Sequence, residues 1–204
     1  MGQQLLTRYG LVTRDAAGAE SLPGGFSAVY EVFRTLEEGG RIRRGFFVAG
    51  LGAMQFAAPA AVDLLRSLRA PAEDAEVVVL GAADPANPYG ALVKWPNADH
   101  AGTGRGPARA SGAHVVLVDG HLVAWLARSG TSLIVWLPEH EPDRGRHLRG
   151  LAHALHTSPL LRGRDGGLIL AEVNGVAIVD HPLAAALDAE GFVAGAKGMR
   201  APHA

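Results

Sequence analysis

The sequence predicts an α+β fold, in which residues 1–70 form an N-terminal winged helix and residues 71–204 form a mixed, sheet-rich and β-barrel-like domain. Apolar residues recur at helical spacing up to Glu38, between glycine stops. A strand, a glycine turn and a second strand follow these helices, which is the order of a helix-turn-helix with a wing. Beyond Pro71 the pattern changes to short strand-like runs separated by turn residues.

The first two expected helices are short and are bounded by residues suited to helix ends. One covers residues 3–9 and stops at Gly10, because glycine readily takes the conformation that ends a helix. Thr13 can cap a second helix that runs through residues 14–20, and Asp15 in its first turn complements the helix dipole. Two short helices joined by tight turns are therefore expected.

The third helix and the wing complete the expected N-terminal domain. Residues 26–38 carry one apolar stripe, made of Phe26, Val29, Tyr30, Phe33 and Leu36. Residues 41–48 and 54–57 read as two strands around a Gly50-Leu51-Gly52 turn. Pro59 then opens a helix over residues 60–68, since proline fits the first helical turn.

The second domain is expected to alternate strands with two helices. The expected strands cover residues 77–80, 91–95, 114–119, 121–128, 131–137, 168–173, 176–179 and 192–194. Asp119-Gly120 is the strongest hairpin signal in the chain, because both residues tolerate positive φ. Helices are expected over residues 142–156 and 182–189, and residues 97–107 read as a polar, glycine-rich loop.

The composition limits the classes of function. The 204 residues include no cysteine, which excludes disulfides and thiolate zinc sites. No apolar run reaches the roughly 20 residues needed to span a bilayer, and the first residues lack the pattern of a signal peptide, so we expect no membrane partner and a cytoplasmic location. The net charge is −1, whereas a dedicated nucleic-acid binder usually has a basic excess. Nucleic-acid binding must therefore rest on local patches.

Two basic patches are candidates for such binding. In the expected third helix the exposed side offers Ser27 and Arg34, but also two glutamates that would repel phosphates. The wing is the better candidate, because its arginines are clustered and suit backbone contacts that position without reading sequence: Arg41, Arg43 and Arg44. The alternative is a winged helix used for protein packing, with solvated arginines.

The helix over residues 142–156 offers a second basic face. Arg146 and Arg149 share it with His153 and His156, which makes a phosphate-facing surface a second hypothesis. The two histidines are close enough to share a metal, but the sequence offers no third ligand, so no metal site is expected.

The segment Asp84-Pro85-Ala86-Asn87-Pro88-Tyr89-Gly90 is unusually stiff. Its prolines fix φ, and its acidic and amide side chains can satisfy turn amides. Such a loop is either a structural plug or one wall of a site. In the second case Asp84 is the candidate catalytic carboxylate, because burial would raise its pKa. In the first case Asp84 caps a turn.

Walker-type phosphate loops are absent, so the chain holds no ATPase site.

Several of these segments together resemble the C-terminal region of the large helicase-related (Lhr) family of bacterial superfamily 2 DNA-repair helicases. The segments, which extend through most of the chain, are Arg8-Tyr9-Gly10-Leu11-Val12-Thr13-Arg14, Pro23-Gly24-Gly25-Phe26-Ser27, residues 39–48, Gly50-Leu51-Gly52, Gln55-Phe56-Ala57, residues 84–90, Trp95-Pro96 and the hairpins of residues 115–137. That family region is similar to AlkZ-type DNA glycosylases, which carry a Gln-apolar-Gln or Gln-apolar-Asp signature. Here Gln55 and Phe56 are followed by Ala57.

The resemblance implies a non-motor module of a DNA-repair helicase. It implies tandem winged helices and a β-barrel module, with ATP and magnesium used only by a motor that this chain does not contain. The implied partners are DNA, single-stranded or duplex, the helicase core of the same or a parent polypeptide, and further copies of the chain in a homo-oligomer. The implied alternative activity is that of a DNA glycosylase acting on uracil or a damaged base through a carboxylate-activated water.

Overall fold

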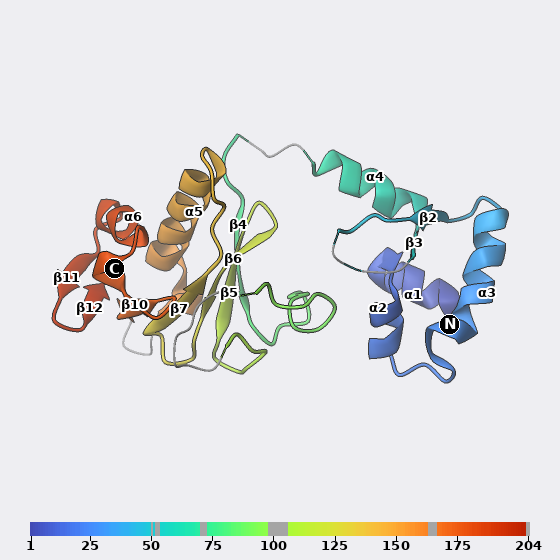
Figure 1. Cartoon of the computed structure of the whole chain (residues 1–204), viewed down its shortest axis with the longest axis horizontal. Helices are drawn as coiled ribbons and strands as arrows, with labels where there is room; N and C mark the ends of the chain where they lie inside the picture. Colours follow the sequence, from blue (N-terminus) through green and yellow to red (C-terminus); the bar gives the residue numbers. More distant parts are fainter. Residues whose placement is uncertain (50, 52–53, 70–72, 98–105, 163–166, 203–204) are drawn as a thin grey trace. The chain divides into compact units, whose positions relative to one another are not determined.

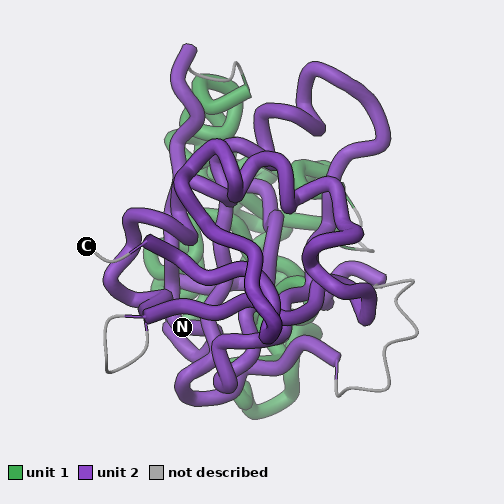
Figure 2. Tube along the Cα trace, turned by 90° about the vertical axis from the view of Figure 1, so that its left-hand side faces the viewer, with its two compact units in different colours: residues 1–71, 91–93 green, residues 72–90, 94–204 purple. Residues whose placement is uncertain are grey.

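The computed structural model describes residues 1–49, 51, 54–69, 73–97, 106–162 and 167–202. The chain separates into two compact units (Figure 2): unit 1 is residues 1–71 with 91–93, and unit 2 is residues 72–90 with 94–204. Each unit has an apolar core of its own. Parts of the expected glycine turn at residues 50–52 and most of the expected loop at residues 97–107 lie outside the described residues.

Unit 1 is a winged helix, as the sequence predicts (Figure 1). Its elements are α1 (Gly2–Tyr9), β1 (Leu11–Val12), α2 (Arg14–Ala19), α3 (Gly25–Glu38), β2 (Arg43–Gly45), β3 (Gln55–Ala57) and α4 (Pro59–Ser67). The strands form an antiparallel sheet in the order β1-β3-β2. The Thr13 hydroxyl accepts a hydrogen bond from the Ala16 amide at 3.0 Å, which confirms its capping role. Strand β1 was not predicted, because two residues are too few to show alternation.

Aromatic side chains join helix α3 to the small sheet. Phe33 and Phe56 are fully buried, with ring centroids 5.2 Å apart. Tyr30 meets Phe56 edge-on at 5.7 Å, an arrangement that stabilises beyond the area buried. The predicted apolar stripe of α3 therefore faces the core, and β3 supplies the surface on which it packs.

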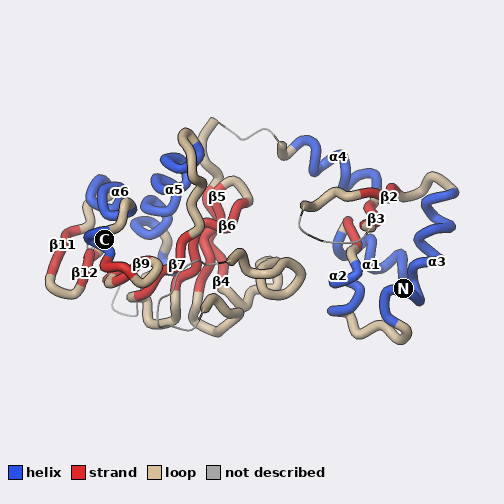
Figure 3. The backbone as a smooth tube through the Cα atoms, in the orientation of Figure 1, coloured by secondary structure: helices blue, strands red, loops and turns tan. Residues whose placement is uncertain are grey.

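Unit 2 is built around a six-stranded sheet with helix α5 (Asp143–Thr157) on one face (Figure 3). The strand order is β10-β9-β7-β6-β5-β4, and only β7 and β9 are parallel. The bounds are β4 (Val77–Gly81), β5 (His114–Val118), β6 (His121–Leu126), β7 (Ser132–Val135), β9 (Glu172–Val173) and β10 (Val176–Ala177). The predicted hairpin is present, with φ of +50° at Asp119 and +77° at Gly120.

The sheet is open rather than barrel-like. Strands β4 and β10 stand at its two edges, and neither pairs with the other among the described residues. A closed barrel needs every strand to have two neighbours. The mixed α+β class is thus confirmed, but the expected barrel-like closure is wrong. Helix α5 covers one face of the sheet, and the edge strand β10 ends after two residues at a 3₁₀ turn, Ile178–Asp180.

The stiff segment of residues 84–90, together with Trp95, packs on the second face of this sheet. Strand residues alternate between the faces, so that Val116 lies in the core under α5 while Val115 lies in a second cluster. Tyr89 and Trp95 pack against that second cluster with their rings stacked, 6.1 Å between centroids. The loop therefore acts as a plug over apolar surface. The strand expected over residues 91–95 is absent, and turn residues with one isolated bridge take its place.

The C-terminal part of unit 2 contains a third, three-stranded sheet. Its order is β11-β12-β8, with β8 (Ile169–Leu170), β11 (Val193–Gly195) and β12 (Gly198–Arg200). Helix α6 (Leu183–Ala189) lies between β8 and β11 in the chain, and the turn Pro159–Leu161 follows α5. The single strand expected over residues 168–173 is in fact two strands, β8 and β9, which belong to different sheets. One apolar run cannot reveal that its two halves pair with different partners.

The helices that the structure describes are all too short or too polar to span a lipid bilayer.

Candidate nucleic-acid interface in the wing

One buried amide fixes the connection between β2 and β3. The Gln55 side chain is fully buried, and its Oε1 accepts hydrogen bonds from the amides of Phe47 and Val48, both at 2.9 Å. Its Nε2 donates to the carbonyls of Val48 and Leu51, also at 2.9 Å. The amide thereby uses both of its donor hydrogens and accepts twice through its oxygen. Backbone groups at the base of the wing that the sheet leaves unpaired are satisfied by this single side chain.

The three arginines of the wing are exposed. Arg43 and Arg44 are neighbours on β2, so their side chains leave opposite sides of the strand. Arg44 Nε lies 3.9 Å from Glu37 Oε2, a loose contact that water screens. The guanidinium groups of Arg41 and Arg43 have no carboxylate partner in the part of the chain that the structure describes. The wing therefore presents uncompensated positive charge in a chain of net charge −1.

A hollow of about 390 Å³ lies beside these arginines. It is lined by Arg43, Arg44, Phe47, Pro59, Val62, Asp63 and Arg66. Its one carboxylate, on Asp63, already lies 3.3 Å from Arg66. The excess of cations makes this hollow suited to an anionic group such as a phosphate.

The exposed side of α3 is less suitable for phosphate contacts. Ser27 is exposed near the start of the helix. Arg34 lies between two glutamates of the same helix, 3.3 Å from Glu31 and 3.4 Å from Glu38. The charge of Arg34 is therefore compensated locally, and this side of α3 carries one more negative than positive charge. Contacts from Ser27 and Arg34 to nucleic acid stay predictions.

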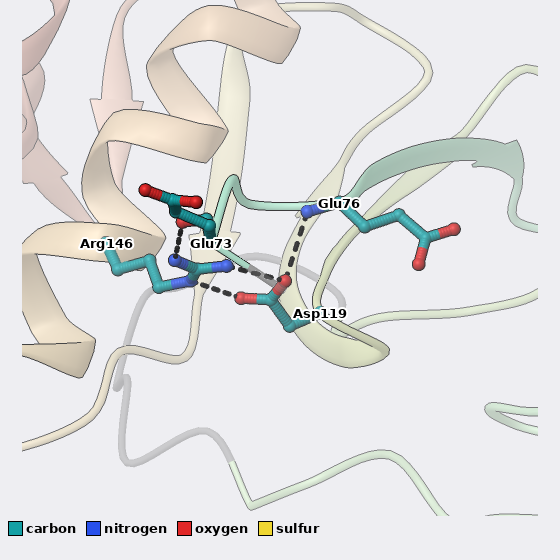
Figure 4. A network of polar contacts seen from close by, with 4 residues as sticks. All are labelled: Glu73, Glu76, Asp119 and Arg146. Carbon is teal, nitrogen blue, oxygen red and sulfur yellow. Dashed lines mark hydrogen bonds and ion pairs between the residues drawn. The ribbon is translucent and has the colours of Figure 1, made fainter. Parts of the chain in front are cut away.

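Arg146 is engaged inside unit 2 (Figure 4). Its Nε and Nη2 donate to the two oxygens of Asp119 at 2.6 and 3.1 Å, and its Nη1 donates to the Glu73 carbonyl at 2.9 Å. Asp119 also accepts from the Glu76 amide at 3.0 Å. The hydrogen bonds from Arg146 hold the pKa of the Asp119 carboxyl below its ordinary value, although burial opposes them. This bidentate pair ties α5 to the β5–β6 turn, which argues against the phosphate-binding role expected for Arg146.

The rest of the expected basic face of α5 is also partly occupied. His153 Nδ1 lies 3.5 Å from a Glu190 oxygen. Arg149 is exposed and forms no ion pair within the described part of the chain. Roles for Arg146 and Arg149 in a phosphate-facing surface stay predictions, although Arg146 and His153 each contact a carboxylate of unit 2.

Asp84 is exposed, whereas a buried carboxylate was expected in the catalytic interpretation. Its Oδ1 accepts from the Ala86 amide at 2.8 Å, which is the turn-capping geometry. Arg109 braces the same loop by donating to four backbone carbonyls, those of Ala83, Asp84, Asn87 and Tyr89, at 2.6–3.2 Å. The structure thus gives Asp84 a capping role, and its catalytic role stays a prediction.

Within the described ranges, no three His, Asp or Glu side chains gather as a metal site would require.

Comparisons with known proteins place this architecture in a family. Residues 1–77 match the model of the winged-helix domain of the large helicase-related protein. Over 180 residues the chain is 43% identical to a Mycolicibacterium smegmatis protein named "Lhr helicase/ probable uracil glycosylase", with 86% of this chain and 11% of that protein aligned. Over 202 residues it is 37% identical to the Escherichia coli "Lhr helicase/uracil glycosylase", with 98% of this chain and 13% of that protein aligned. The chain belongs to the Lhr family.

The family resemblance inferred from the sequence is therefore confirmed. The Lhr chain described here spans 11% and 13% of the two relatives, so it corresponds to one region of much longer proteins.

The geometry also gives a role to the Gln55-Phe56-Ala57 segment of this Lhr chain. Gln55 resembled the first residue of the AlkZ-type signature, but here its amide is buried and fully used by the wing backbone. Sequence reasoning missed this role, and it also missed the bracing role of Arg109. The only signal for Gln55 was a polar residue in an otherwise apolar strand, and nothing in the sequence marked Arg109.

Proposed function

We propose that this Lhr-family chain is a non-motor module that binds DNA through its wing. Phosphate contacts would come from Arg41, Arg43 and Arg44. The observation that carries the proposal is the exposure of Arg41 and Arg43, which have no acidic partner among the described residues. Arg43 lies on β2, where it pairs with Ala57 of β3. Because the backbone of β2 is already held in the sheet, contacts from Arg43 and Arg44 would order little further backbone.

The comparisons support the same proposal. A winged helix of the Lhr type occupies residues 1–77, and both relatives are named helicases, whose substrates are nucleic acids. Contacts to phosphates would position DNA without reading its sequence. The helicase core of the same or a parent polypeptide is the protein partner that we propose.

Support of assembly is the second part of the proposal. Helix α4 buries Val62 but leaves Leu64 59% exposed, and Leu65 and Leu68 are exposed as well. Apolar side chains gathered on one short helix are available to contact another part of a larger protein or another copy of the chain.

Exchanging the three wing arginines together should remove most DNA binding. In the variant Arg41→Gln/Arg43→Gln/Arg44→Gln we expect the affinity for duplex DNA at low salt to fall roughly 10- to 1,000-fold. The slope of log K against log salt should become shallower by about 2–3, because each lost phosphate contact removes about 0.9. Fluorescence anisotropy with a labelled duplex at several salt concentrations measures both quantities.

The matched control removes the same charge elsewhere. The variant Lys94→Gln/Arg128→Gln/Lys197→Gln changes three exposed cations of unit 2 and should bind within about threefold of the parent chain. Equal losses in the two variants would mean that net charge, not the wing, governs binding. Binding by the parent chain that ignores salt would contradict the proposal.

A second candidate function is a DNA glycosylase that acts on uracil or a damaged base. It is favoured by the names of both relatives, which include uracil glycosylase. In this candidate a flipped base would be released with the help of a carboxylate-activated water, and Asp84 is the carboxylate that we propose.

Base release can be tested directly on this chain. Incubation with a uracil-containing strand, followed by alkali, should cleave the strand at the uracil position. In Asp84→Asn the initial rate should fall by roughly a hundredfold or more, the usual contribution of a general base. Asp188→Asn, at another exposed aspartate, is the control and should keep the parent rate. A parent chain that leaves the strand intact would rule out this second candidate.

A further inference from the structure

The wing also presents an aromatic ring to solvent. Phe46 follows β2 directly and is 74% exposed. The other five phenylalanines are buried or half-buried, namely Phe26, Phe33, Phe47, Phe56 and Phe192. A large exposed aromatic is unfavourable in water and contributes nothing to the core of unit 1.

The backbone on both sides of Phe46 is held in place. Gly45, before it, pairs with Gln55 across the sheet. Phe47, after it, donates its amide to Gln55 Oε1 at 2.9 Å. The ring is thus carried on an ordered backbone, and it can be covered by a ligand without first ordering the chain.

Two exposed arginines stand close to this ring along the wing sequence. Arg44 lies two residues before Phe46, and Arg43 lies three residues before it, both exposed. Exposed cations beside an exposed aromatic ring are the pattern with which proteins hold single-stranded nucleic acid, where cations track the backbone and bases stack on rings. In a duplex the faces of the bases are already stacked on each other, so this ring has nothing to stack on without distorting the helix.

We propose that Phe46 is a base-stacking residue, and that the wing prefers single-stranded nucleic acid to duplex. This inference rests on the proposed phosphate contacts of the wing and adds the class of nucleic acid that the same surface takes. The arginines supply the salt-dependent attraction. Phe46 supplies a contact that depends on an unstacked base and hardly on salt.

The test compares two ligands and four variants of the full 204-residue chain. The ligands are a labelled single strand and the duplex of the same sequence, titrated by anisotropy over a range of salt. The variants are Phe46→Ala, Phe46→Trp and, as a matched control, Val32→Ala, which removes another exposed apolar side chain of unit 1 (48% exposed). The triple arginine variant proposed above is titrated alongside them. Since Phe46 is not part of the core, Phe46→Ala should fold normally, which circular dichroism verifies.

In Phe46→Ala we expect single-strand affinity to fall about tenfold or more, with an unchanged salt slope and duplex affinity within about twofold. Phe46→Trp should keep single-strand affinity, because a larger ring stacks at least as well, and Val32→Ala should bind as the parent does. Quenching of a 2-aminopurine base in the single strand should accompany binding of the parent and be lost in Phe46→Ala.

The outcomes separate this inference from the function on which it rests. If Phe46→Ala binds the single strand like the parent while the triple arginine variant does not, stacking is overturned and the phosphate contacts stand. Equal losses on single strand and duplex would overturn the single-strand preference. If Phe46→Ala binds normally but loses self-association in native mass spectrometry, the ring is an assembly contact and the inference is wrong. If neither the arginines nor Phe46 affect binding, the proposed function itself fails.

Discussion

Replacing Gln55 by alanine should destabilise unit 1 by about 2–4 kcal/mol and release the wing loop. The substitution removes both hydrogen bonds to the amides of Phe47 and Val48 and both to the carbonyls of Val48 and Leu51. It also leaves a void at a fully buried site. Each unsatisfied buried polar group costs about 1–3 kcal/mol, and less where water can enter. The expected destabilisation is therefore smaller than this cost added up over the four lost hydrogen bonds. For a domain of this size the melting temperature should drop on the order of 10–20 °C.

Hydrogen exchange reports this change where it occurs. The amides of Phe47 and Val48 should exchange much faster in Gln55→Ala than in the parent chain, because they lose their acceptor. All three tryptophans lie in unit 2, at positions 95, 125 and 136, so their fluorescence transition should stay in place while the far-ultraviolet circular dichroism transition shifts.

Two further variants give the Gln55 prediction its specificity. Gln55→Glu keeps an acceptor for the two amides but loses the two donors, so it should lie between the parent and Gln55→Ala. Gln4→Ala removes an exposed glutamine of α1 and should change stability by less than about 0.5 kcal/mol. Unchanged exchange at Phe47 and Val48 in Gln55→Ala would show that the wing is ordered without this amide.

Replacing Gly198 by alanine should disrupt the three-stranded sheet of unit 2. Gly198 has φ of +115°, a conformation that residues with a Cβ atom rarely adopt. A Cβ atom there would overlap the carbonyl oxygen of Leu170 and approach Ala171 Cα to 2.8 Å. Both contacts are with backbone, so no side chain can move aside to relieve them. We expect a loss of more than about 3 kcal/mol, seen as an earlier tryptophan-fluorescence transition on denaturant unfolding.

Gly195→Ala is the matched control for this prediction. Gly195 pairs with Gly198 across the same sheet, but a Cβ atom there would approach nothing more closely than 3.8 Å, and its φ is not in the left-handed region. Gly195→Ala should therefore stay within about 1 kcal/mol of the parent. Similar stabilities for the two variants would mean that β8 and β12 separate at little cost.

Local signals in the sequence predicted the helices well. The helix of residues 26–38 was expected from its apolar stripe and lies at Gly25–Glu38, and the cap at Thr13 forms as expected. These features depend on residues within one or two turns of each other, so the sequence alone contains the information. The same holds for the Asp119-Gly120 hairpin, whose turn needs only two residues that accept positive φ.

Long-range pairing was predicted less well. The run of residues 168–173 looks like one strand, yet Leu170 pairs with Met199 and Val173 pairs with Leu133. Arg146 looked like a surface cation because its partner Asp119 is 27 residues away. In both cases the partner residue is remote in sequence, and the neighbouring residues give no sign of which partner it will be.

The sequence by itself determined the family, the winged helix and the cluster of arginines in the wing. These features depend on motifs and on the spacing of residues that are close together in the chain. Only the tertiary structure decided which charged groups are available. It assigned Arg146 to Asp119 and compensated Arg34 with its helical neighbours, while it left Arg41 and Arg43 without acidic partners in the described residues. The physical reason is that the availability of a charge depends on which groups folding brings within a few ångströms, and spacing along the chain does not fix that distance.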